Sequence, residues 1–422
     1  MNASLEDILS FRDKKSARRA ELTEKYGLPA VSFSLNLPGP EKRSFLSDFA
    51  FQKAVQKVRT VFGPPVFFET LSEIGGESAF FVFDSPAPDL KRRAVALEDA
   101  AFGRLFDLDV YDGKGEALHR KTPRRCLLCE KPAAECARSR SHDLSALVEK
   151  TRSLLLEFCA DTLSGEAVAA LLAEANFTPK PGLIDEANNG AHSDMTMLTL
   201  ERSAYSLRPF FKNAVLIGFS GAMEALSENG KAAEKAMFAA TGGVNTHKGA
   251  ALLFELVLAG AGRYLLDGAD PLETAGQWAA AKTPAENTPG AEVREKYGAA
   301  GVLAEAVFGF PLAKATYEAM AKEDELFALL TAMSLCEDTN LLYRGGREAL
   351  DFVQKEAGKA LALPSEKRLT AARRLDKALI RKNLSPGGAA DLFALALFFR
   401  FEEPLFLKKA PSSGDFFTYL AI

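Results

Sequence analysis

The chain contains few cysteines and has only a small excess of one charge over the other. Its 422 residues include five cysteines, an odd number that is far below the density of a secreted disulfide scaffold. The formal net charge is only −4, so the charge balance indicates no general affinity for nucleic acids. The remaining composition, with 47% hydrophobic and 26% charged residues, is that of an ordinary soluble globular protein.

Long hydrophobic runs are also absent. The longest apolar stretch, residues 250–262, is interrupted by Glu255 and is far shorter than the roughly 20 residues that a membrane-spanning helix needs. The first residues do not have a basic region followed by an apolar one, so we expect no signal peptide. The sequence therefore predicts a cytoplasmic protein that does not enter a membrane.

The length of the chain favours two domains, because 422 residues exceed what one typical core organises. No Pro-, Gly- or Ser-rich linker and no internal repeat marks a boundary. The positions of the motifs place it between about residues 143 and 163. We take residues 1–160 and 161–422 as the two predicted domains.

The first part of the chain mixes helix and strand patterns. Helices are predicted at residues 5–26 and 90–102, and strands at residues 30–37, 66–71, 78–84 and 105–111. Gly75 and Gly76 lie between two of these strands and predict a hairpin. The N-terminal domain is therefore expected to be α+β.

After residue 143 the strand signal nearly disappears. Apolar residues at 168, 171, 172 and 175 follow helical spacing, and Ser164 is the predicted N-cap of that helix. Similar stripes recur at residues 210–225, 250–266, 325–335 and 391–399, and residues 279–296 are expected to be exposed loop and helix. The sequence therefore predicts a second domain that is mostly all-α.

Three polar clusters interrupt the Ala- and Leu-rich background of this second part. They comprise residues 178–185 with 188–194, residues 245–249, and residues 338–340 with 344–346. Each places side chains that bind phosphate or metal beside a glycine, which lets a ligand approach the backbone. Packing alone gives no reason for so many of them, so this half is predicted to be an enzyme.

These clusters, followed by residues 383–391, resemble the triphosphoribosyl-dephospho-CoA synthase family from roughly residue 160 to the end of the chain. The resemblance implies that the 2′-hydroxyl of 3′-dephospho-CoA displaces adenine from C1 of the ATP ribose. ATP and 3′-dephospho-CoA are therefore the expected substrates. Such a site must hold the triphosphate, activate a hydroxyl and help adenine to leave.

The motifs supply the candidate site residues of this half. The predicted phosphate and substrate ligands are Lys180, Gly182, Asn188, Asn245, Lys248, Gly249, Asn340, Arg344, Gly345, Gly387 and Gly388. The predicted Mg²⁺ ligands, one of which is alternatively the general base, are Asp185, Asp194 and Asp338. The predicted catalytic residues are His192, Asp194, His247 and Glu305, and acid–base work or triphosphate contact is open to both histidines.

Residues 385–388 precede an apolar helix and predict its N-terminus, either as a capped turn with Asp391 in the first turn or as a phosphate site.

The chain departs from the family pattern at Glu186, where arginine is usual, at Leu303 and Ala304, where Arg-Gly is usual, and at Ala389, where serine is common. Two lost arginines remove charge-assisted hydrogen bonds of about 1.5–3 kcal/mol each. These departures bear on the activity and the exact donor of the synthase half.

The first part of the chain resembles another family, the holo-citrate lyase synthases, or apo-citrate lyase phosphoribosyl-dephospho-CoA transferases. The matching segments are residues 36–40, 103–110 and 125–142. The resemblance implies a nucleotidyltransferase-type domain, in which a serine hydroxyl of the apo acyl carrier protein of citrate lyase attacks the α-phosphate of the triphosphoribosyl donor and expels pyrophosphate. The whole chain looks like a natural fusion that makes and then attaches one prosthetic group.

Asp107 and Asp109 are separated by one residue in a predicted strand, so both carboxylates point to the same face. Two convergent carboxylates suit Mg²⁺, which bridges phosphate oxygens. An edge strand with its polar face in water is the alternative. The resemblance favours the metal site, with Arg104 as the candidate clamp on the leaving pyrophosphate.

Cys126, Cys129, Cys136 and His142 are separated by two, six and five residues, a set that suits tetrahedral zinc. Three reduced cysteines that are simply small and partly buried are the alternative. Basic residues outnumber acidic ones around them. This surplus predicts either a solvated basic face or a surface that steers the carrier protein or a coenzyme A phosphate.

Two other functions compete with this interpretation. One keeps the chemistry but moves the target to a malonate decarboxylase carrier protein. Residues 103–110 and 126–142 favour citrate lyase instead. The other is a non-catalytic assembly factor that binds the carrier protein, and substitution of Asp107 and Asp109 by asparagine would separate it from a metal-dependent transferase.

Overall fold

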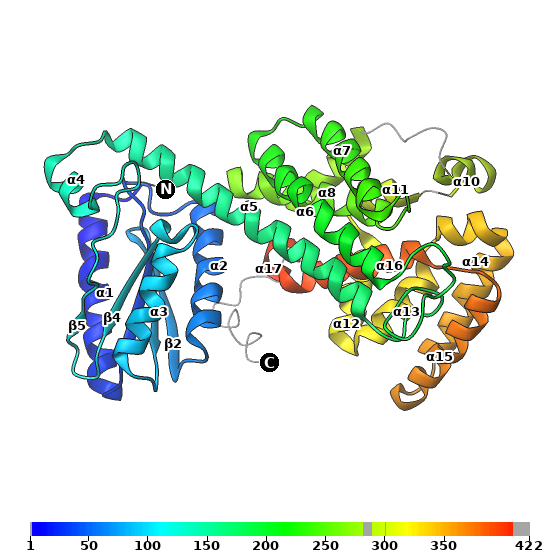
Figure 1. Ribbon diagram of the computed structural model, residues 1–422, viewed down its shortest axis with the longest axis horizontal. Helices are drawn as coiled ribbons and strands as arrows, with labels where there is room; N and C mark the ends of the chain where they lie inside the picture. Colours follow the sequence, from blue (N-terminus) through cyan, green and yellow to red (C-terminus); the bar gives the residue numbers. More distant parts are fainter. Residues whose placement is uncertain (1, 282–288, 300, 408–422) are drawn as a thin grey trace. The chain divides into compact units, whose positions relative to one another are not determined.

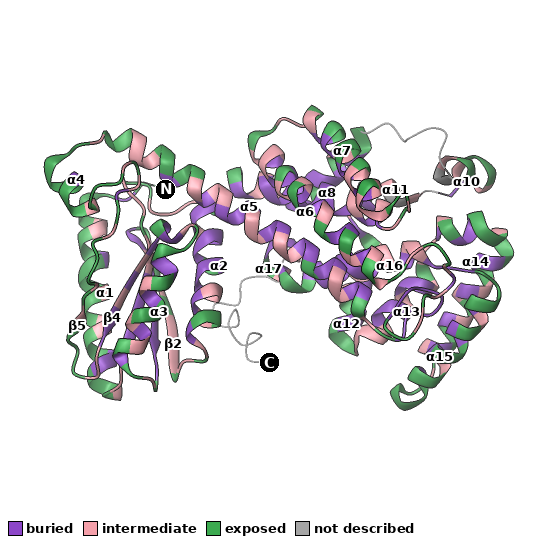
Figure 2. Cartoon of the chain, in the orientation of Figure 1, coloured by how far each residue is buried: buried purple, intermediate pink, exposed green. Residues whose placement is uncertain are grey.

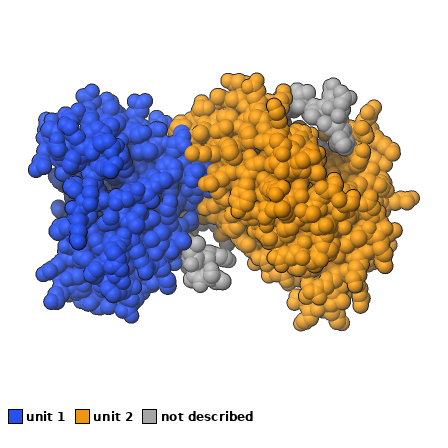
Figure 3. Space-filling model, in the orientation of Figure 1, with its two compact units in different colours: residues 1–162 blue, residues 163–422 orange. Residues whose placement is uncertain are grey.

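The computed structural model of the chain describes residues 2–281, 289–299 and 301–407. The chain divides into two compact units, residues 1–162 and 163–422 (Figure 3). The division falls inside one long helix, α5 (Leu144–Asn176). No linker-like composition marks the boundary because the chain is helical there.

The first unit is built on a five-stranded sheet with the order β2-β3-β1-β4-β5, in which every neighbouring pair is antiparallel. Its strands are β1 (Ala30–Leu35), β2 (Phe67–Glu73), β3 (Gly76–Val82), β4 (Phe106–Tyr111) and β5 (Ala117–Leu118). Its helices before α5 are α1 (Leu5–Tyr26), α2 (Phe45–Phe62), α3 (Ala87–Asp99), the 3₁₀ turn η1 (Gly103–Leu105) and α4 (Ala133–Ser139). The predicted α+β class is confirmed.

Helices cover both faces of this sheet (Figure 1). The register pairs Ser32 of β1 with Phe80 of β3, so these side chains share one face, and Leu22 of α1 belongs to the same buried cluster as Phe80. On the opposite face Phe33 stacks on Phe51 of α2, with ring centroids 5.6 Å apart. The sheet therefore lies between α1 and α2.

Helix α1 has the predicted bounds because the sequence encodes both of its ends. Ser4 Oγ accepts the Asp7 N–H at 3.1 Å, and Asp7 Oδ2 accepts the Ser4 N–H at 2.8 Å. Gly27 ends the helix in the left-handed region with φ 60°. Helix α3 lies earlier than the predicted 90–102, because the chain is extended at Ala100. Helix α2 was not predicted.

All the helices and strands assigned to the described residues of the second unit are helices, joined by loops, which confirms the predicted mostly all-α class. Its helices after α5 are α6 (Met197–Ser220), α7 (Glu224–Thr241), α8 (Lys248–Asp267), α9 (Pro271–Ala281), α10 (Pro289–Tyr297), α11 (Gly301–Val307), α12 (Pro311–Lys322), α13 (Glu325–Leu335), α14 (Thr339–Leu361), α15 (Ser365–Arg381), α16 (Gly387–Phe401) and α17 (Glu403–Phe406).

Helix α8 is largely buried in this unit (Figure 2). Phe254 of α8 lies 5.6 Å from the ring of Phe211 and 5.3 Å from that of Phe398. A Cβ on Gly218 of α6 would lie 1.9 Å from the Ala259 carbonyl oxygen, so glycine lets α6 and α8 pack in backbone contact. Among the described residues α8 alone is long and apolar enough to cross a membrane, but 67% of its apolar window is buried in the unit.

Two local predictions for this unit need correction, and a third falls partly outside the described residues. Ser164 is not an N-cap, because α5 continues through it and the residue is fully buried. The stripe predicted over residues 210–225 crosses a break, since α6 ends at Ser220 and Gly221 turns with φ 74°. Of the predicted exposed loop and helix at 279–296, residues 282–288 lie outside the described residues and α10 covers the end.

Candidate functional sites

The two aspartates of the first unit lie on β4 with both side chains on one face. The side chains of Asp107 and Asp109 are 37% and 45% exposed. The register places Ser34 opposite Asp107 and Ser32 opposite Asp109, so two hydroxyls face the carboxylates. The Ser32 hydroxyl is buried and has no hydrogen-bond partner within the described part of the chain. An unsatisfied oxygen beside two carboxylates fits the oxygen ligands that Mg²⁺ takes.

Each of these carboxylates has a cation beside it. Arg124 Nη1 donates to Asp107 Oδ1 at 2.6 Å, and Lys15 Nζ lies 3.9 Å from Asp109 Oδ2. Arg124 also pairs with Glu98, whose side chain is 2% exposed. Burial raises the pKa of Glu98, and the Arg124 charge opposes that rise. Each aspartate therefore lies beside a cation, and the cation beside Asp107 also pairs with a buried carboxylate.

Arg104 contacts the segment that carries Cys126, Cys129, Cys136 and His142, which we call the cysteine segment. Its Nη1 donates to the Cys126 carbonyl oxygen at 2.8 Å, and its Nη2 lies 3.6 Å from Glu130 Oε1. A Cβ on the preceding Gly103 would lie 2.2 Å from the Leu97 carbonyl oxygen, so only glycine lets the chain pass α3 here. Arg124 is the arginine that touches Asp107, and the clamp role of Arg104 stays a prediction.

Cys126, Cys129, Cys136 and His142 come together in space. One ligand atom from each lies within 4.8 Å of the others. Cys129 Sγ is 3.5 Å from Cys136 Sγ and 3.3 Å from His142 Nε2. All five cysteines of the chain are free thiols. Three thiols and one imidazole so close together form a candidate metal site.

In the second unit, residues 178–194 form a loop that acidic side chains fasten. Asp185 Oδ2 accepts the Lys180 N–H at 3.1 Å, and its Oδ1 accepts two backbone N–H groups of the following turn at 2.8 and 3.0 Å. Asn188 Nδ2 and the Gly182 N–H both donate to Asp376 of α15, at 3.2 and 3.0 Å. Asp185 and Asn188 thus shape the loop, and their metal and phosphate roles stay predictions.

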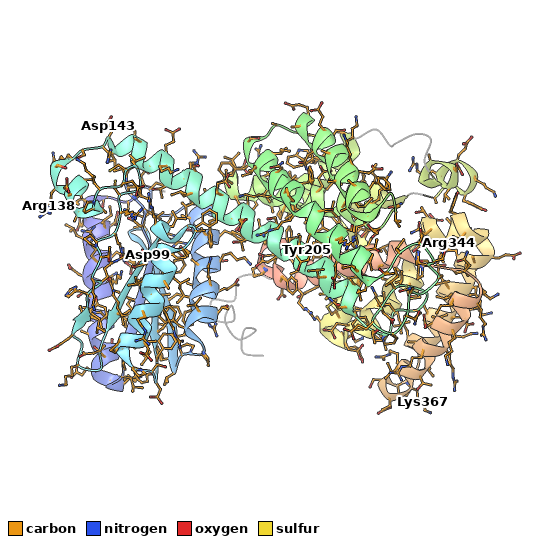
Figure 4. The ribbon with its side chains drawn as sticks, viewed as in Figure 1. Asp99, Arg138, Asp143, Tyr205, Arg344 and Lys367 are labelled. Atoms are coloured by element: carbon orange, nitrogen blue, oxygen red, sulfur yellow. The ribbon has the colours of Figure 1, made fainter. Side chains whose placement is uncertain are left out.

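His192 lies where this loop meets two others. Its Nε2 is 2.8 Å from Ser385 Oγ, and its Nδ1 is 3.4 Å from Arg344 Nη2 and 3.7 Å from Asp194 Oδ1. Arg344, labelled in Figure 4, also donates to the Ala191 carbonyl at 2.8 Å. Arginine only donates, so the Arg344 contact favours a proton on Nε2, whereas the Asp194 contact favours a proton on Nδ1. Burial and the Arg344 charge lower the pKa of His192, which keeps the imidazole neutral near pH 7.

Lys180 and His247 belong to a second, buried polar group. The Lys180 side chain is 1% exposed, and its Nζ donates to Glu174 Oε1 at 2.7 Å. His247 Nδ1 is 2.7 Å from Ser203 Oγ, whereas its Nε2 is buried without a hydrogen-bond partner among the residues described. Burial and the Lys180 charge lower the pKa of His247 to about 4. The imidazole is therefore neutral at every pH near 7.

Asp338 joins the N-termini of two helices. Its Oδ1 accepts the N–H groups of Asn340 and the next residue at 2.8 and 3.2 Å, and its Oδ2 accepts the Ala389 N–H of α16 at 3.1 Å. A Cβ on Gly387 would lie 2.3 Å from Asn340 Nδ2, and one on Gly388 would lie 3.0 Å from Asp338 Oδ2. Burial raises the pKa of Asp338. The motif at residues 338–346 therefore contacts the motif at residues 383–391.

Asp391 connects these two motifs to the motif at residues 245–249. The prediction that Asp391 lies in the first turn of α16 and caps that helix is wrong, because no acidic residue lies there. Its carboxylate accepts the Ala250 N–H of α8 and occupies the space beside Gly249, where a Cβ would lie 2.0 Å from Asp391 Oδ2. Burial and then the charges of Asp338 and Glu174 raise the pKa of Asp391.

Several predicted residues lie apart from these contacts. Lys248 Nζ donates to Glu234 Oε1 at 2.5 Å in a half-exposed ion pair, and Asn245 is exposed. Glu305 Oε1 accepts the Ala313 N–H at 2.9 Å and so caps α12. Gly345 precedes the break of α14 at Gly346, where φ is 68°. The departures from the family pattern differ in setting: Glu186 is exposed, Leu303 and Ala304 are half-buried, and Ala389 is fully buried.

Sequence reasoning missed the partners that complete both sites. In the first unit these are Lys15, Ser32, Ser34 and Glu98, and in the second they are Glu174, Ser203 and Asp376. The alternation of Ser32 and Ser34 in the strand at 30–35 was a usable signal, but the pairing of that strand with β4 was not visible in the sequence. The other partners lie on helices with no motif around them.

The comparisons with known proteins divide the chain at nearly the same residue as the structure does. Residues 3–158 match the family described as apo-citrate lyase phosphoribosyl-dephospho-CoA transferase (CitX), and residues 160–409 match ATP:dephospho-CoA triphosphoribosyl transferase (CitG). Protein CitXG of Haemophilus influenzae is 36% identical over 94% of this chain and 96% of that protein. Protein CitXG of Leuconostoc mesenteroides subsp. cremoris is 29% identical over 94% of this chain and 96% of that protein.

A relative of the second half alone is also found. The 2-(5''-triphosphoribosyl)-3'-dephosphocoenzyme-A synthase of Haemophilus ducreyi is 36% identical over 64% of this chain and 98% of that protein. The α+β unit matches one transferase family and the all-α unit matches the other, so together they define a bifunctional transferase. The chain belongs to the CitXG family, in which both transferase families are joined in one protein.

Proposed function

We propose that this protein makes and attaches the prosthetic group of citrate lyase. The second half, residues 161–422, forms 2′-(5″-triphosphoribosyl)-3′-dephospho-CoA from ATP and 3′-dephospho-CoA and releases adenine. The first half, residues 1–160, transfers phosphoribosyl-dephospho-CoA to a serine of the apo acyl carrier protein and releases pyrophosphate. The match of both families, in order, to one chain carries the proposal. Five free thiols fit the reducing cytoplasm, where we place the reaction.

In the transferase half, the carrier serine oxygen forms a bond to the α-phosphorus, and the bond to the pyrophosphate oxygen breaks. Asp107 and Asp109 would hold Mg²⁺, which supplies charge neutralisation to the phosphate oxygens. The unsatisfied Ser32 hydroxyl supports an oxygen ligand set on this face. Arg124, already beside Asp107, is placed to take up charge on the departing pyrophosphate.

In the synthase half, the 2′-oxygen of 3′-dephospho-CoA bonds to C1 of the ribose as the bond to adenine breaks. His192 is neutral, with its Nε2 beside Ser385 and its Nδ1 between Arg344 and Asp194. We assign this group to proton transfer at the reacting hydroxyl, and Lys180, Gly249, Gly387 and Gly388 to the triphosphate. Asp194, 61% exposed, is the most open of the three predicted Mg²⁺ ligands.

A second metal fits the first unit. The donor set of Cys126, Cys129, Cys136 and His142 suits Zn²⁺, which supplies structural cross-linking when four such ligands surround it. Hard oxygen-seeking ions such as Mg²⁺ do not favour thiolates. We therefore propose zinc at the cysteine segment and magnesium at the aspartates.

Mass spectrometry of the apo carrier protein tests the whole proposal. After incubation with this protein, ATP, 3′-dephospho-CoA and Mg²⁺, we expect one serine to gain the mass of phosphoribosyl-dephospho-CoA and free adenine to appear. Transfer only from preformed triphosphoribosyl-dephospho-CoA would mean that the synthase half is silent, as the departures at Glu186, Leu303 and Ala304 suggest. No transfer from either source, including to a malonate decarboxylase carrier protein, would favour an assembly factor.

A further inference from the structure

The cysteine segment has almost no hydrophobic core. Between residues 112 and 150, all of which the structure describes, only Cys126 and Cys136 are buried. Two backbone hydrogen bonds close the segment on itself: the Cys126 N–H donates to the Lys131 carbonyl and the Ala133 N–H to the Arg124 carbonyl, both at 2.8 Å. A stretch with so few apolar contacts needs another source of order.

The ligand atoms already have nearly the separations that zinc imposes. Zinc bonds to sulfur and nitrogen of about 2.0–2.3 Å place tetrahedral ligands about 3.5–3.8 Å apart. The observed distances from Cys129 Sγ are 3.5 Å to Cys136 Sγ and 3.3 Å to His142 Nε2.

This segment is also the part of the chain that reaches the transferase aspartates. Arg124, two residues before Cys126, donates to Asp107 Oδ1 at 2.6 Å. Arg104, three residues before Asp107, holds the Cys126 carbonyl at 2.8 Å. The metal ligands and the aspartates are therefore connected by two arginines that cross between them in opposite directions.

We propose that zinc at Cys126, Cys129, Cys136 and His142 is a structural clamp that positions Arg124 against Asp107. The proposal rests on the proposed transferase function of the first unit. Arg124 keeps the role proposed for it at the departing pyrophosphate, and its placement depends on the metal. Transfer to the carrier protein requires zinc, whereas the synthase reaction of the second unit does not.

Metal analysis and proteolysis test the clamp without any activity. We expect about one zinc per chain in protein purified under reducing conditions, its loss in His142→Ala and its retention in His142→Cys, which restores a fourth ligand. Cys159→Ala, a cysteine of the same unit outside the set, is the matched control and should keep zinc. Removing zinc from the wild type with a chelator should expose the bonds after Arg120, Lys121, Arg124 and Arg125 to trypsin, and readdition should protect them.

Separate assays of the two halves test the coupling between zinc binding and transfer to the carrier protein. With preformed triphosphoribosyl-dephospho-CoA, His142→Ala should lose about 10- to 100-fold in kcat/KM for transfer, the range typical of lost supporting contacts around a site. Adenine release by the second unit should be unchanged. Arg124→Ala should keep its zinc and lose transfer to a similar extent, and Arg124→Lys should restore part of it.

The outcomes separate the zinc clamp from the proposed transferase function of the first unit. A wild type without zinc, or with a Cys129–Cys136 disulfide in its place, overturns the clamp even if transfer is observed. Zinc loss that leaves both transfer and the trypsin pattern unchanged overturns the coupling. A wild type that binds zinc and shows chelator-dependent proteolysis but transfers nothing leaves the clamp standing and refutes the transferase function.

Discussion

The aspartates of the two units lie in different environments, although the sequence assigned all of them to magnesium. Asp107 and Asp109 project from a strand, are 37% and 45% exposed, and have side-chain cations beside them. Two of the three candidates of the second unit, Asp185 and Asp338, are 5% and 2% exposed, and both accept backbone N–H groups of a turn or a helix start. The third, Asp194, is 61% exposed.

This difference follows from the local backbone. A strand that is paired with its neighbours satisfies its own amides, so its side-chain oxygens remain available to a ligand. A loop or a helix N-terminus leaves amides unpaired, and a nearby aspartate is drawn into satisfying them. Burial also matters more in the second unit, where charged groups such as Lys180 and Asp338 are removed from water.

The largest effect is expected from breaking the buried ion pair of the second unit. Lys180→Met leaves the Glu174 carboxylate without its partner at 6% exposure, which should cost about 3–5 kcal/mol of stability. Chemical denaturation that follows the second unit measures this loss. The double variant Lys180→Met with Glu174→Leu should recover most of it, and failure of the double variant to recover would mean that Lys180 has other buried partners.

A comparably large effect, on catalysis and not on stability, is expected at the exposed aspartates. Asp107→Asn with Asp109→Asn should lower transfer from preformed triphosphoribosyl-dephospho-CoA by about 10²–10³-fold, the loss typical of a removed charge-stabilising group. Because both side chains are over one third exposed, the melting temperature should barely change. Adenine release by the second unit is the internal control. Unchanged transfer would support a non-catalytic assembly role.

Acid should weaken the second unit through His247. Its folded-state pKa of about 4 lies below the ordinary value of 6.5, so the folded state binds fewer protons between these values. This contribution to stability is complete above pH 6.5 and is lost as the pH falls towards 4. Between pH 7 and pH 5 the loss should be about 2 kcal/mol.

Urea unfolding of the wild type and of His247→Gln at both pH values isolates this term. Asp338 and Asp391, whose pKa values are raised by burial, act in the opposite direction in both proteins and cancel in the comparison. Equal acid losses in the two proteins would show that His247 is protonated in the folded state.

The smallest effect on stability is expected at Lys248. Its pair with Glu234 is 39% and 38% exposed, so Lys248→Ala should cost no more than about 0.5 kcal/mol. If Lys248 leaves Glu234 to contact the triphosphate, KM for ATP should rise in this variant while the melting temperature stays the same. Glu234→Ala is the matched control and should leave KM unchanged, whereas equal effects of both variants would assign Lys248 to the surface pair alone.

How far the sequence predicted the fold depended on the element. Helix α1 was predicted to the residue because Ser4 and Gly27 encode its ends locally. Helix α2 was missed because its many Phe and Val residues have modest helix propensity, and only burial against the sheet stabilises them. Ser164 looked like a cap because the sequence does not reveal that α5 continues through it.

The sequence by itself determined the family and the order of the two halves and named candidate site residues, because these depend on short contiguous motifs. Tertiary structure decided which motif residues face one another. Arg124 and not Arg104 reaches Asp107, and Asp391 meets Gly249 across two helices. Such pairings depend on strand register and helix packing, which join residues that are far apart in the chain.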